Sequence, residues 1–373
     1  MASLGVAVIG TGFMGKCHAM AWSHVRTVFG GETDIHLEVL CDTNAEVTKQ
    51  KAAEAGFRRA ETDWRQLLGD KRIDIVSITT PNNLHREMAV AFLAAGKHVW
   101  CEKPMALTLD DAVAMTAAAA ASKAKTLMGY NYIRNPALAH ARKIILEGTL
   151  GRIIHFRGQV DEDYQADENV PWSWRSRLET GGLGVLGDLT CHLVSFAHYL
   201  VGDIAQVCAD IDTVHKMRSV PGSEEKRGVE NEDIAHAMVR FNSGATGILM
   251  ASRAAHGRKN MIRVEVHGTK GMIAFDQERM NELQLYVADE PAAERGFKTI
   301  LTGGLHPPYG MFTPAPGHQL GFNELKVIEC RHFVDCIESG DEAYVNFAEG
   351  LKIEKIIHGI AASAASRSWL DVG

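Results

Sequence analysis

The sequence predicts an α/β protein with two domains, a doubly wound parallel sheet followed by a domain built on an antiparallel or mixed sheet. Strand-like and helix-like stretches alternate over residues 1–128, and a glycine turn joins the first pair. Short strand-like stretches then predominate over residues 129–373. A chain of 373 residues suits two domains, since one domain takes roughly 150 residues.

The glycine turn follows an apolar strand, Val6–Ile9, and opens a helix that we expect to reach Phe29. The G-x-G-x-x-G spacing allows a tight turn, a close approach of pyrophosphate to the backbone, and close packing of helix on strand. The alternative is a glycine turn in another kind of α/β protein. We favour a dinucleotide site lined by Gly10, Gly12, Phe13, Met14 and Gly15.

An acidic residue ends the second predicted strand, Ile35–Cys41. This residue, Asp42, is placed to bind the ribose of the dinucleotide. A carboxylate accepts a hydrogen bond from a 2′-hydroxyl but repels a 2′-phosphate, and no arginine follows it directly. The predicted cofactor is therefore NAD, with NADP less favoured.

Two further strands, Ile73–Ile78 and His98–Cys101, end at polar motifs. Parallel strands bring their carboxyl ends to one edge, where doubly wound sheets bind ligands. The motifs Thr79–Asn82 and Glu102–Pro104 should therefore share a crevice with the glycine turn. The intervening helices are expected at Ala45–Ala55, Leu84–Ala95 and Leu109–Lys123, with a last strand at Thr126–Met128.

The second domain is predicted to contain closely spaced strands accompanied by helices. A helix after Pro136 should reach Glu147, and long loops are expected at Lys216–Glu230 and Leu301–Gly321. Alternating patterns predict strands at Ile153–Val160, Ala205–Asp212, Ala235–Phe241, Thr246–Ala251, Arg263–Val266, Met272–Phe275 and Leu283–Val287. The other helices are expected at Leu186–Val201, Phe322–Ser339 and Phe347–Ser366.

Composition excludes several classes of protein. The net charge of -7 disfavours a nucleic-acid partner, and no run of 18 apolar residues predicts a membrane span. The N-terminus reads as a strand, not a signal peptide. Seven cysteines without a C-x-x-C pair suggest reduced thiols in a cytoplasmic protein. No metal-binding spacing is present, so we expect no metal.

Lys103 is the first candidate for chemistry, because it follows a strand at the expected ligand edge. Its ammonium group would stabilise an alkoxide that develops as hydride leaves an alcohol, or help to move the proton. The alternative is a surface lysine before a turn, the commoner fate of this residue type.

A second candidate pair is Asp188 and His192, which follow a glycine-rich stretch and lie four residues apart. On a helix they share one face, and a carboxylate can orient an imidazole so that its other nitrogen takes a proton. The alternative is an exposed helix pair. A third motif, Pro171–Arg175, carries Trp172 and Arg175, which suit a nicotinamide lid or a core anchor.

Together these motifs resemble the glucose–fructose oxidoreductase / inositol dehydrogenase / MocA family over nearly the whole chain. The resemblance rests on the glycine turn, Thr80–His85, Gly96–Val99 and Glu102–Pro104 in the first part. In the second part it rests on Tyr130–Tyr132 with Arg134 and Pro136, and on Gly181–His192. One departure is Thr190, where many members have a glycine or another small residue.

The resemblance implies an N-terminal Rossmann domain and a C-terminal α/β domain with an open, mostly antiparallel sheet that forms homodimers or homotetramers. It implies that His192 is the general acid/base, that Asp188 orients it and that Lys103 polarises the substrate oxygen. Residues matching cofactor-lining positions are Thr80, Asn82, His85, Glu102, Trp172 and Arg175.

Within the family, the chain looks nearest to levoglucosan-dehydrogenase-like and inositol-dehydrogenase-like members. In the second domain, the likeness to levoglucosan-dehydrogenase-like members rests on Pro171–Arg175, Ala255–Asn260 and Gly296–Thr299. The resemblance implies an NAD(P)-dependent oxidoreductase acting on CH–OH groups, which oxidises a secondary hydroxyl of a sugar, anhydrosugar or inositol. Candidate substrate ligands are Asn131, Arg134, Glu162, Asp163 and His306. The alternatives are an NADP-linked reductase of a keto-sugar and a non-catalytic nucleotide-sensing protein.

Overall fold

The computed structural model describes residues 3–373 and divides the chain into two compact units. The first unit joins the chain up to Arg134 with the later segment Gly321–Leu351. The second unit joins Asn135–Leu320 with Lys352–Gly373. A single boundary at residue 128, as expected from chain order, does not describe this division, because the chain returns to the first unit after residue 320.

The first unit is built on a six-stranded parallel sheet with the strand order β3-β2-β1-β4-β5-β6. Consecutive strands run outward from β1 in both directions, so the strand order reverses between β1 and β4. That reversal is where doubly wound sheets bind their ligands. The strands are β1 (Ser3–Ile9), β2 (Asp34–Cys41), β3 (Arg59–Glu61), β4 (Ile75–Ile78), β5 (His98–Cys101) and β6 (Thr126–Met128).

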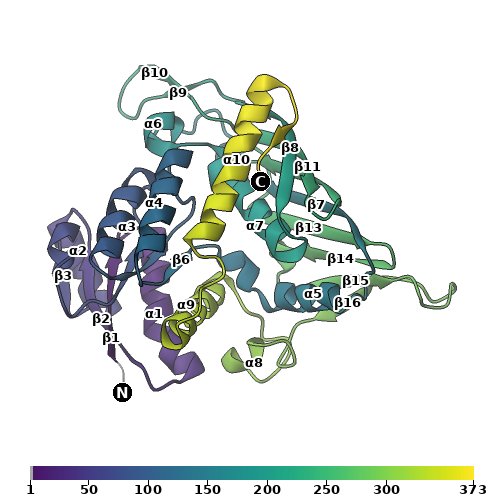
Figure 1. The fold of residues 1–373 in the computed structure, drawn as a ribbon. Coiled ribbons are helices and arrows are strands. Elements are labelled where there is room, and N and C mark those ends of the chain that lie inside the picture. The colour runs from purple at the N-terminus through teal and green to yellow at the C-terminus, as the bar shows by residue number, and fades with distance from the viewer. Residues whose placement is uncertain (1–2) are drawn as a thin grey trace. The chain divides into compact units, whose positions relative to one another are not determined.

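Helices flank this sheet, and two of them begin at side chains that cap free N–H groups of the first turn. Asn44 accepts a hydrogen bond from the backbone of α2, and Thr108 does the same for α4. The helices are α1 (Phe13–Phe29), α2 (Ala45–Ala55), α3 (His85–Ala94), α4 (Leu109–Ala121) and α9 (Phe322–Ser339), with short 3-10 turns at Trp64–Leu67, Asn82–Leu84 and Asn131–Arg134. Helices α3 and α4 pack side by side (Figure 1).

Helix α9 packs along α1, which explains why a segment so late in the chain belongs to the first unit. Phe322 at its start stacks on Phe13 with ring centroids 5.8 Å apart. The buried indole of Trp100 on β5 lies near Phe333 of α9. Apolar burial of this kind supplies most of the stability of a helix inside a domain.

The second unit is built on a nine-stranded mixed sheet with the order β16-β15-β14-β13-β7-β12-β11-β8-β17. Only β7 and β12 pair in parallel in this sheet of the described chain. The expected antiparallel or mixed sheet is thus confirmed as mixed. Its strands are β7 (Ile153–Asp161), β8 (Ile204–Asp212), β11 (Ile234–Phe241), β12 (Thr246–Ser252), β13 (Met261–Gly268), β14 (Gly271–Asp276), β15 (Glu282–Val287), β16 (Lys298–Leu301) and β17 (Leu370–Asp371).

Two stretches expected to be loops contain regular structure. The hairpin of β9 (Met217–Ser219) and β10 (Lys226–Gly228) lies inside Lys216–Glu230, and α8 (Tyr309–Phe312) lies inside the second stretch. All three residues of β10 are exposed, so no apolar alternation marks it in the sequence.

One face of the large sheet packs against α5 (Pro136–Leu146) and α7 (Cys191–Leu200), as Figure 1 shows. Strand β11 alternates buried and exposed side chains, with His236, Met238 and Arg240 on the exposed face. The other helices are α6 (Leu178–Gly181) and α10 (Phe347–Ser366).

All seven cysteines are free thiols, and only Cys208 among them is not buried. Among residues 3–373, no helix is long and apolar enough to cross a bilayer.

Candidate active site

The glycine turn has the geometry that a dinucleotide site requires. Gly10 has a φ of 107°, and a side chain at Gly15 would lie 2.0 Å from the carbonyl oxygen of Gly10. Space is open around Gly12, and no side chain caps the start of α1. Bare backbone and free N–H groups at a helix N-terminus are what a pyrophosphate binds, so these residues fit the expected cofactor. Phe13 is exposed beside them and Met14 is half-buried.

Asp42 follows β2 at the same edge and is held in place by the glycine turn. Its Oδ2 accepts hydrogen bonds from the backbone N–H and the hydroxyl of Thr11, at 2.8 and 2.7 Å. Partial burial opposes ionisation, but hydrogen bonds from Thr11 and Thr43 outweigh it and hold the pKa of Asp42 below its ordinary value. The site therefore presents a charged, fixed carboxylate.

The segment after β4 places Thr80 and Asn82 at the edge, both half-buried, with Asn82 opening a 3-10 turn. His85 lies behind them with no exposed surface. Its Nδ1 is 3.0 Å from Pro104 O and its Nε2 is 2.9 Å from Thr80 O. We expected His85 to line the cofactor. Its ring is enclosed between two loop carbonyls, and its role toward a cofactor stays a prediction.

The segment after β5 presents Lys103 half-buried at the edge, whereas Glu102 points into the unit and is 4 % exposed. Glu102 Oε1 is 2.8 Å from His18 Nε2 and 2.5 Å from Lys326 Nζ. The sequence suggested Glu102 as a residue lining the cofactor. Its carboxylate instead belongs to a buried polar cluster, which sequence spacing gave no means to find.

Two of the expected substrate ligands lie on the 3-10 turn Asn131–Arg134 of the first unit. Asn131 is 3 % exposed, and its side-chain nitrogen has no hydrogen-bond partner within the described chain. Arg134 is half-buried at the end of the turn. A buried amide that lacks a partner costs free energy, so Asn131 is suited to a ligand that supplies an acceptor.

In the second unit, Asp188 lies in a π-helical turn, Leu186–Thr190, and His192 lies in the first turn of α7. We expected one regular helix here, but a wider turn precedes α7. Such π turns occur frequently at functional sites. The Asp188 carboxylate is bound by Tyr164, whose hydroxyl donates to Oδ2 over 2.6 Å. Sequence reasoning missed Tyr164, which lies in a loop without periodicity.

Buried polar groups lie next to the π turn Leu186–Thr190, and one of them binds its backbone. Glu232 Oε1 accepts the N–H of Leu186 at 2.9 Å, and burial raises the pKa of its carboxyl. Arg253 pairs with Asp233 at 2.7 Å and is almost fully buried. The glycine-rich approach to Asp188 has a packing cause, because a side chain at Gly184 would lie 2.1 Å from Glu232 O.

The aromatic motif lies beside the β9–β10 hairpin of the second unit. Trp172 Nε1 donates to Gly228 O at 3.0 Å, and the guanidinium of Arg175 stacks over Trp174 at 4.2 Å. Both Trp172 and Trp174 are half-buried, and Arg175 is exposed. The roles of Trp172 and Arg175 toward a cofactor stay predictions.

The remaining candidate ligands of the second unit differ in how firmly they are held. Asp163 pairs with Lys259 at 2.6 Å and accepts the N–H of Gly257, while Glu162 is half-buried at the end of β7. His306 Nδ1 accepts the N–H of Gly303, and its ring packs edge-on against His140 with centroids 4.7 Å apart.

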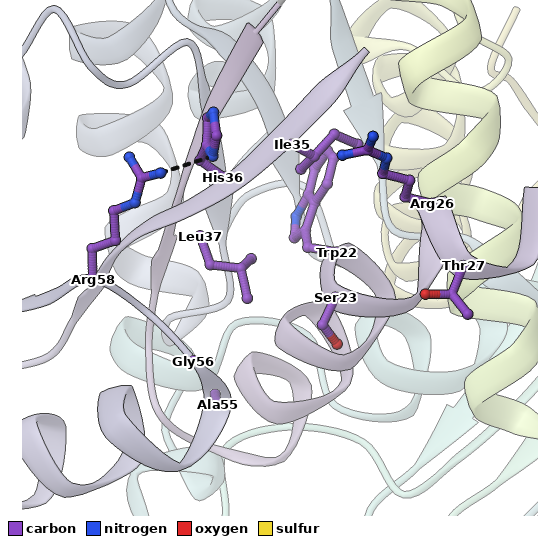
Figure 2. A pocket seen from close by; sticks show the side chains of 10 residues that line it. All are labelled: Trp22, Ser23, Arg26, Thr27, Ile35, His36, Leu37, Ala55, Gly56 and Arg58. Carbon is purple, nitrogen blue, oxygen red and sulfur yellow. Dashed lines mark hydrogen bonds between the residues drawn. The ribbon is translucent and has the colours of Figure 1, made fainter. Parts of the chain in front are cut away.

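Figure 2 shows a groove of about 690 Å³ between α1, β2 and the end of α2 in the first unit. Its two arginines already have partners, because Arg26 pairs with Asp34 and Arg58 pairs with Glu38. The groove adjoins the first half of β2, whereas the glycine turn and Asp42 follow the ends of their strands. We therefore place no chemistry in it.

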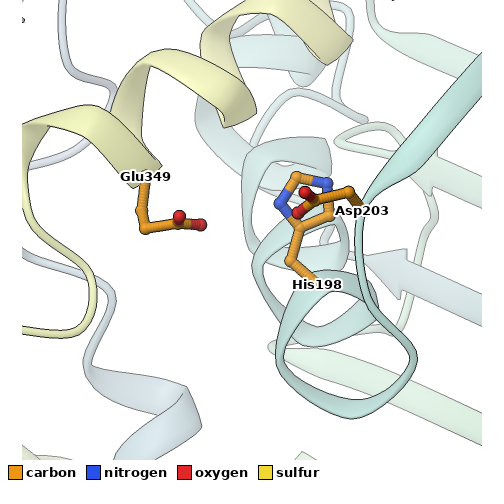
Figure 3. Close-up of side chains that lie close together, drawn as sticks. All are labelled: His198, Asp203 and Glu349. Atoms are coloured by element: carbon orange, nitrogen blue, oxygen red, sulfur yellow. The ribbon is translucent and has the colours of Figure 1, made fainter. Parts of the chain in front are cut away.

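Figure 3 shows His198 near the end of α7 and Asp203 just before β8. Both have structural partners in the second unit. Ile204 N–H lies 3.5 Å from His198 Nε2, and Asp203 pairs with Lys352 at 3.2 Å. The His198 contact closes the turn between α7 and β8, and the ion pair links that turn to α10.

Comparison with known proteins agrees with this geometry. Residues 4–130 match the oxidoreductase family model with an NAD-binding Rossmann fold, and residues 138–274 match the GFO/IDH/MocA C-terminal domain. The levoglucosan dehydrogenase of Pseudarthrobacter phenanthrenivorans is 39% identical, over 100% of this chain and 99% of that protein. The chain belongs to the GFO/IDH/MocA oxidoreductase family.

Membership of this family confirms the resemblance found in the sequence and the α/β fold. A solved levoglucosan dehydrogenase in complex with NADH and levoglucosan matches with a TM-score of 0.96 and 39% identity, covering 99% of each chain. The scyllo-inositol 2-dehydrogenase (NAD(+)) of Bacillus subtilis is 26% identical, over 98% of this chain and 95% of that one. The first unit is thus an NAD-binding Rossmann domain, and the chain is an oxidoreductase.

Proposed function

We propose that this protein is an NAD-dependent dehydrogenase that oxidises a secondary hydroxyl of an anhydrosugar, sugar or inositol to a ketone. The observation that carries the proposal is the pairing of a fixed, charged Asp42 at an NAD-binding glycine turn with whole-length similarity to levoglucosan dehydrogenase. Inositol dehydrogenases, which are more distant relatives, support the wider substrate class.

Three residues carry the chemistry in this proposal. NAD, when bound, supplies the acceptor for the hydride that leaves the alcohol carbon. His192 accepts the hydroxyl proton, and Asp188, itself fixed by Tyr164, orients the imidazole. Lys103 donates a hydrogen bond to the substrate oxygen and stabilises the negative charge that develops there.

Asp42 sets the choice of cofactor in the proposal. Its carboxylate is directed by Thr11 and kept ionised by its hydrogen bonds. An ionised carboxylate accepts the 2′-hydroxyl of NAD and repels the 2′-phosphate of NADP.

The substrate would be bound through its hydroxyl groups, which require donors and acceptors in fixed positions. Asn131 has an unused buried nitrogen, and Asp163 is oriented by Lys259. These features support the candidate ligand set Asn131, Arg134, Glu162, Asp163 and His306.

We also propose that the exposed face of the nine-stranded sheet forms a homodimer or homotetramer. Met238 and Ile248 are exposed on neighbouring strands of this sheet, and apolar side chains exposed together mark interaction surfaces. Free cysteines throughout suit a reducing compartment, so a cytoplasmic location is part of the proposal.

The test is a panel of levoglucosan, inositols, free sugars and their ketones, assayed with NAD and with NADP in both directions at the nicotinamide absorbance. The proposal expects NAD-linked oxidation of at least one cyclic polyol or anhydrosugar. NADP-linked reduction of a keto-sugar alone would make the protein a reductase. NAD binding without turnover of any compound would favour a nucleotide sensor.

A further inference from the structure

A buried cluster of charged side chains lies directly behind Lys103 in the first unit. Lys326 of α9 has no exposed surface, and its Nζ contacts Glu102 Oε1 at 2.5 Å and Glu329 Oε2 at 2.8 Å. The same Nζ lies 5.2 Å above the ring of Trp100. His18 of α1 contacts Glu102 Oε1 from another side, at 2.8 Å.

The charges in this cluster balance. Burial disfavours the ionised carboxylate, but the charge of Lys326 and the hydrogen bond from His18 hold the pKa of Glu102 well below its usual range. Burial lowers the pKa of His18 to about 4. Neutral His18 must therefore donate through Nε2 to Glu102. Burial also raises the pKa of Glu329 to about 7. Near neutral pH the cluster thus holds one firm ion pair, Glu102 and Lys326.

A buried ion pair of this kind is poorly explained by stability alone. Removing two charges from water costs about as much as their attraction returns, and apolar residues of similar volume often stabilise as well. Buried ion pairs are more useful for fixing one arrangement of the groups around them.

The geometry points to the segment that carries Lys103. Glu102 uses Oε1 for Lys326 and His18, and its Oε2 lies 3.3 Å from the backbone N–H of Lys103. The carboxylate is also enclosed by Gly129, where an added side chain would lie 2.5 Å from Oε1. Both oxygens are thus engaged, and the peptide that begins Lys103 is fixed to α1 and α9.

We propose that Lys326 and His18 are positioning residues for catalysis: they hold Glu102 so that Lys103 leaves the end of β5 in one fixed direction. This inference rests on the proposed role of Lys103 in hydride transfer. It also assigns a function to α9, which otherwise only packs within the first unit. Lys326 on this helix lies 224 residues after Glu102 in the sequence. The inference replaces the expected direct contact of Glu102 with the cofactor by an indirect role.

The test compares Lys326→Met with Lys97→Met in the full chain. Lys97 directly precedes β5, at the opposite end of that strand, and donates to the carbonyl oxygens of Asp70 and Ile73 before β4, at 2.9 and 2.7 Å. Both variants lose a lysine that anchors β5. Lys326→Met is expected to lose about 10²-fold in kcat, the cost of misplacing a catalytic group by about 1 Å. Its NAD dissociation constant should stay within about threefold. Lys97→Met is expected to keep the wild-type kcat. Loss of kcat in both variants alike, or in neither, would overturn the proposal.

A second variant keeps the test decisive if Lys326→Met does not fold. Lys326→Met/Glu102→Gln removes both charges together and leaves no unpaired ion. It is expected to regain most of the lost thermal stability. Its kcat should stay low, because no ion pair then fixes residue 102 and the segment that carries Lys103. Recovery of wild-type kcat would show that the pair serves folding alone.

Failure of the proposed function would be recognised separately. If the wild-type protein oxidises no compound, crystal structures of the wild type and the double variant decide the inference. Displacement of residues 102–104 in the variant supports positioning, and an unmoved segment rejects it.

Discussion

The hydroxyl of Tyr164 donates a hydrogen bond to Asp188 Oδ2 over 2.6 Å. Burial and the nearby Asp188 charge raise the pKa of Tyr164 well above its ordinary value. The phenol therefore remains a hydrogen-bond donor near neutral pH. Asp188 lies in the π turn Leu186–Thr190, and Tyr164 lies in a separate loop. The bond therefore fixes the carboxylate from outside its own helical segment.

Replacing this donor should weaken catalysis more than binding of the nucleotide. Tyr164→Phe is expected to lower kcat/KM for the sugar by about tenfold, as expected for the loss of a hydrogen bond to a charged group. The KM for NAD should be unchanged. Steady-state kinetics checks this, with Tyr286→Phe as the control. Tyr286 lies on β15, where its ring packs against Phe297, and it is not one of the candidate site residues. An equal loss in the control would show a general effect of removing a phenol.

Asp42 should determine the preference for NAD. Asp42→Ala is expected to raise the KM for NAD by about tenfold and to lower the KM for NADP, because both the acceptor and the repelling charge are lost. Asp34→Ala, at the other end of β2, is the control and should change neither constant. An unchanged ratio of the two KM values in Asp42→Ala would remove Asp42 from cofactor selection.

Glu329 should make stability depend on pH. Its folded-state pKa is raised by burial to about 7, above the unfolded value of about 4.5. Between these values the folded state binds the extra proton, so this contribution to stability is lost as the pH rises toward 7. Glu329→Gln mimics the protonated form. The difference in Tm, variant minus wild type, should grow from pH 5 to pH 8 by several degrees, the shift expected from about 2.5 kcal/mol, since one pKa unit is about 1.4 kcal/mol.

The matched control for this titration is Glu338→Gln on the same helix. Glu338 is bonded to Thr33 and Arg331 near the surface. The difference in Tm for that variant should not vary in the same way over this range. A flat difference for Glu329→Gln would show that this carboxyl is already ionised at pH 5.

Much of the fold could be predicted because local signals agreed with it. Helix α9 is flanked by Gly321 and Gly340, and its apolar spacing gave both ends correctly. Its place in the first unit could not be predicted, because no local sequence pattern shows which domain a late helix packs against. A lysine is also an ordinary residue on the polar face of an amphipathic helix, so only burial distinguishes Lys326.

The sequence predicted the candidate residues at the strand ends, but not the residues that hold them in position. Asp42 and Lys103 follow apolar strands, so the parallel sheet places both at one edge. Tyr164 and His18 act across long sequence separations, with no spacing rule to connect them to their partners. The same reason applies to Glu102, whose carboxylate contacts side chains of α1 and α9 far away in the sequence.

In the proposed reaction, Lys103 acts in hydride transfer and not in holding NAD. Lys103→Ala, assayed with the best substrate of the panel, should lose about 10³-fold in kcat, as expected for removing a group that stabilises developing charge. The NAD dissociation constant, measured by titration of the same preparation, should stay within about threefold of the wild type. Turnover at the wild-type rate, with NAD bound as tightly, would contradict the account.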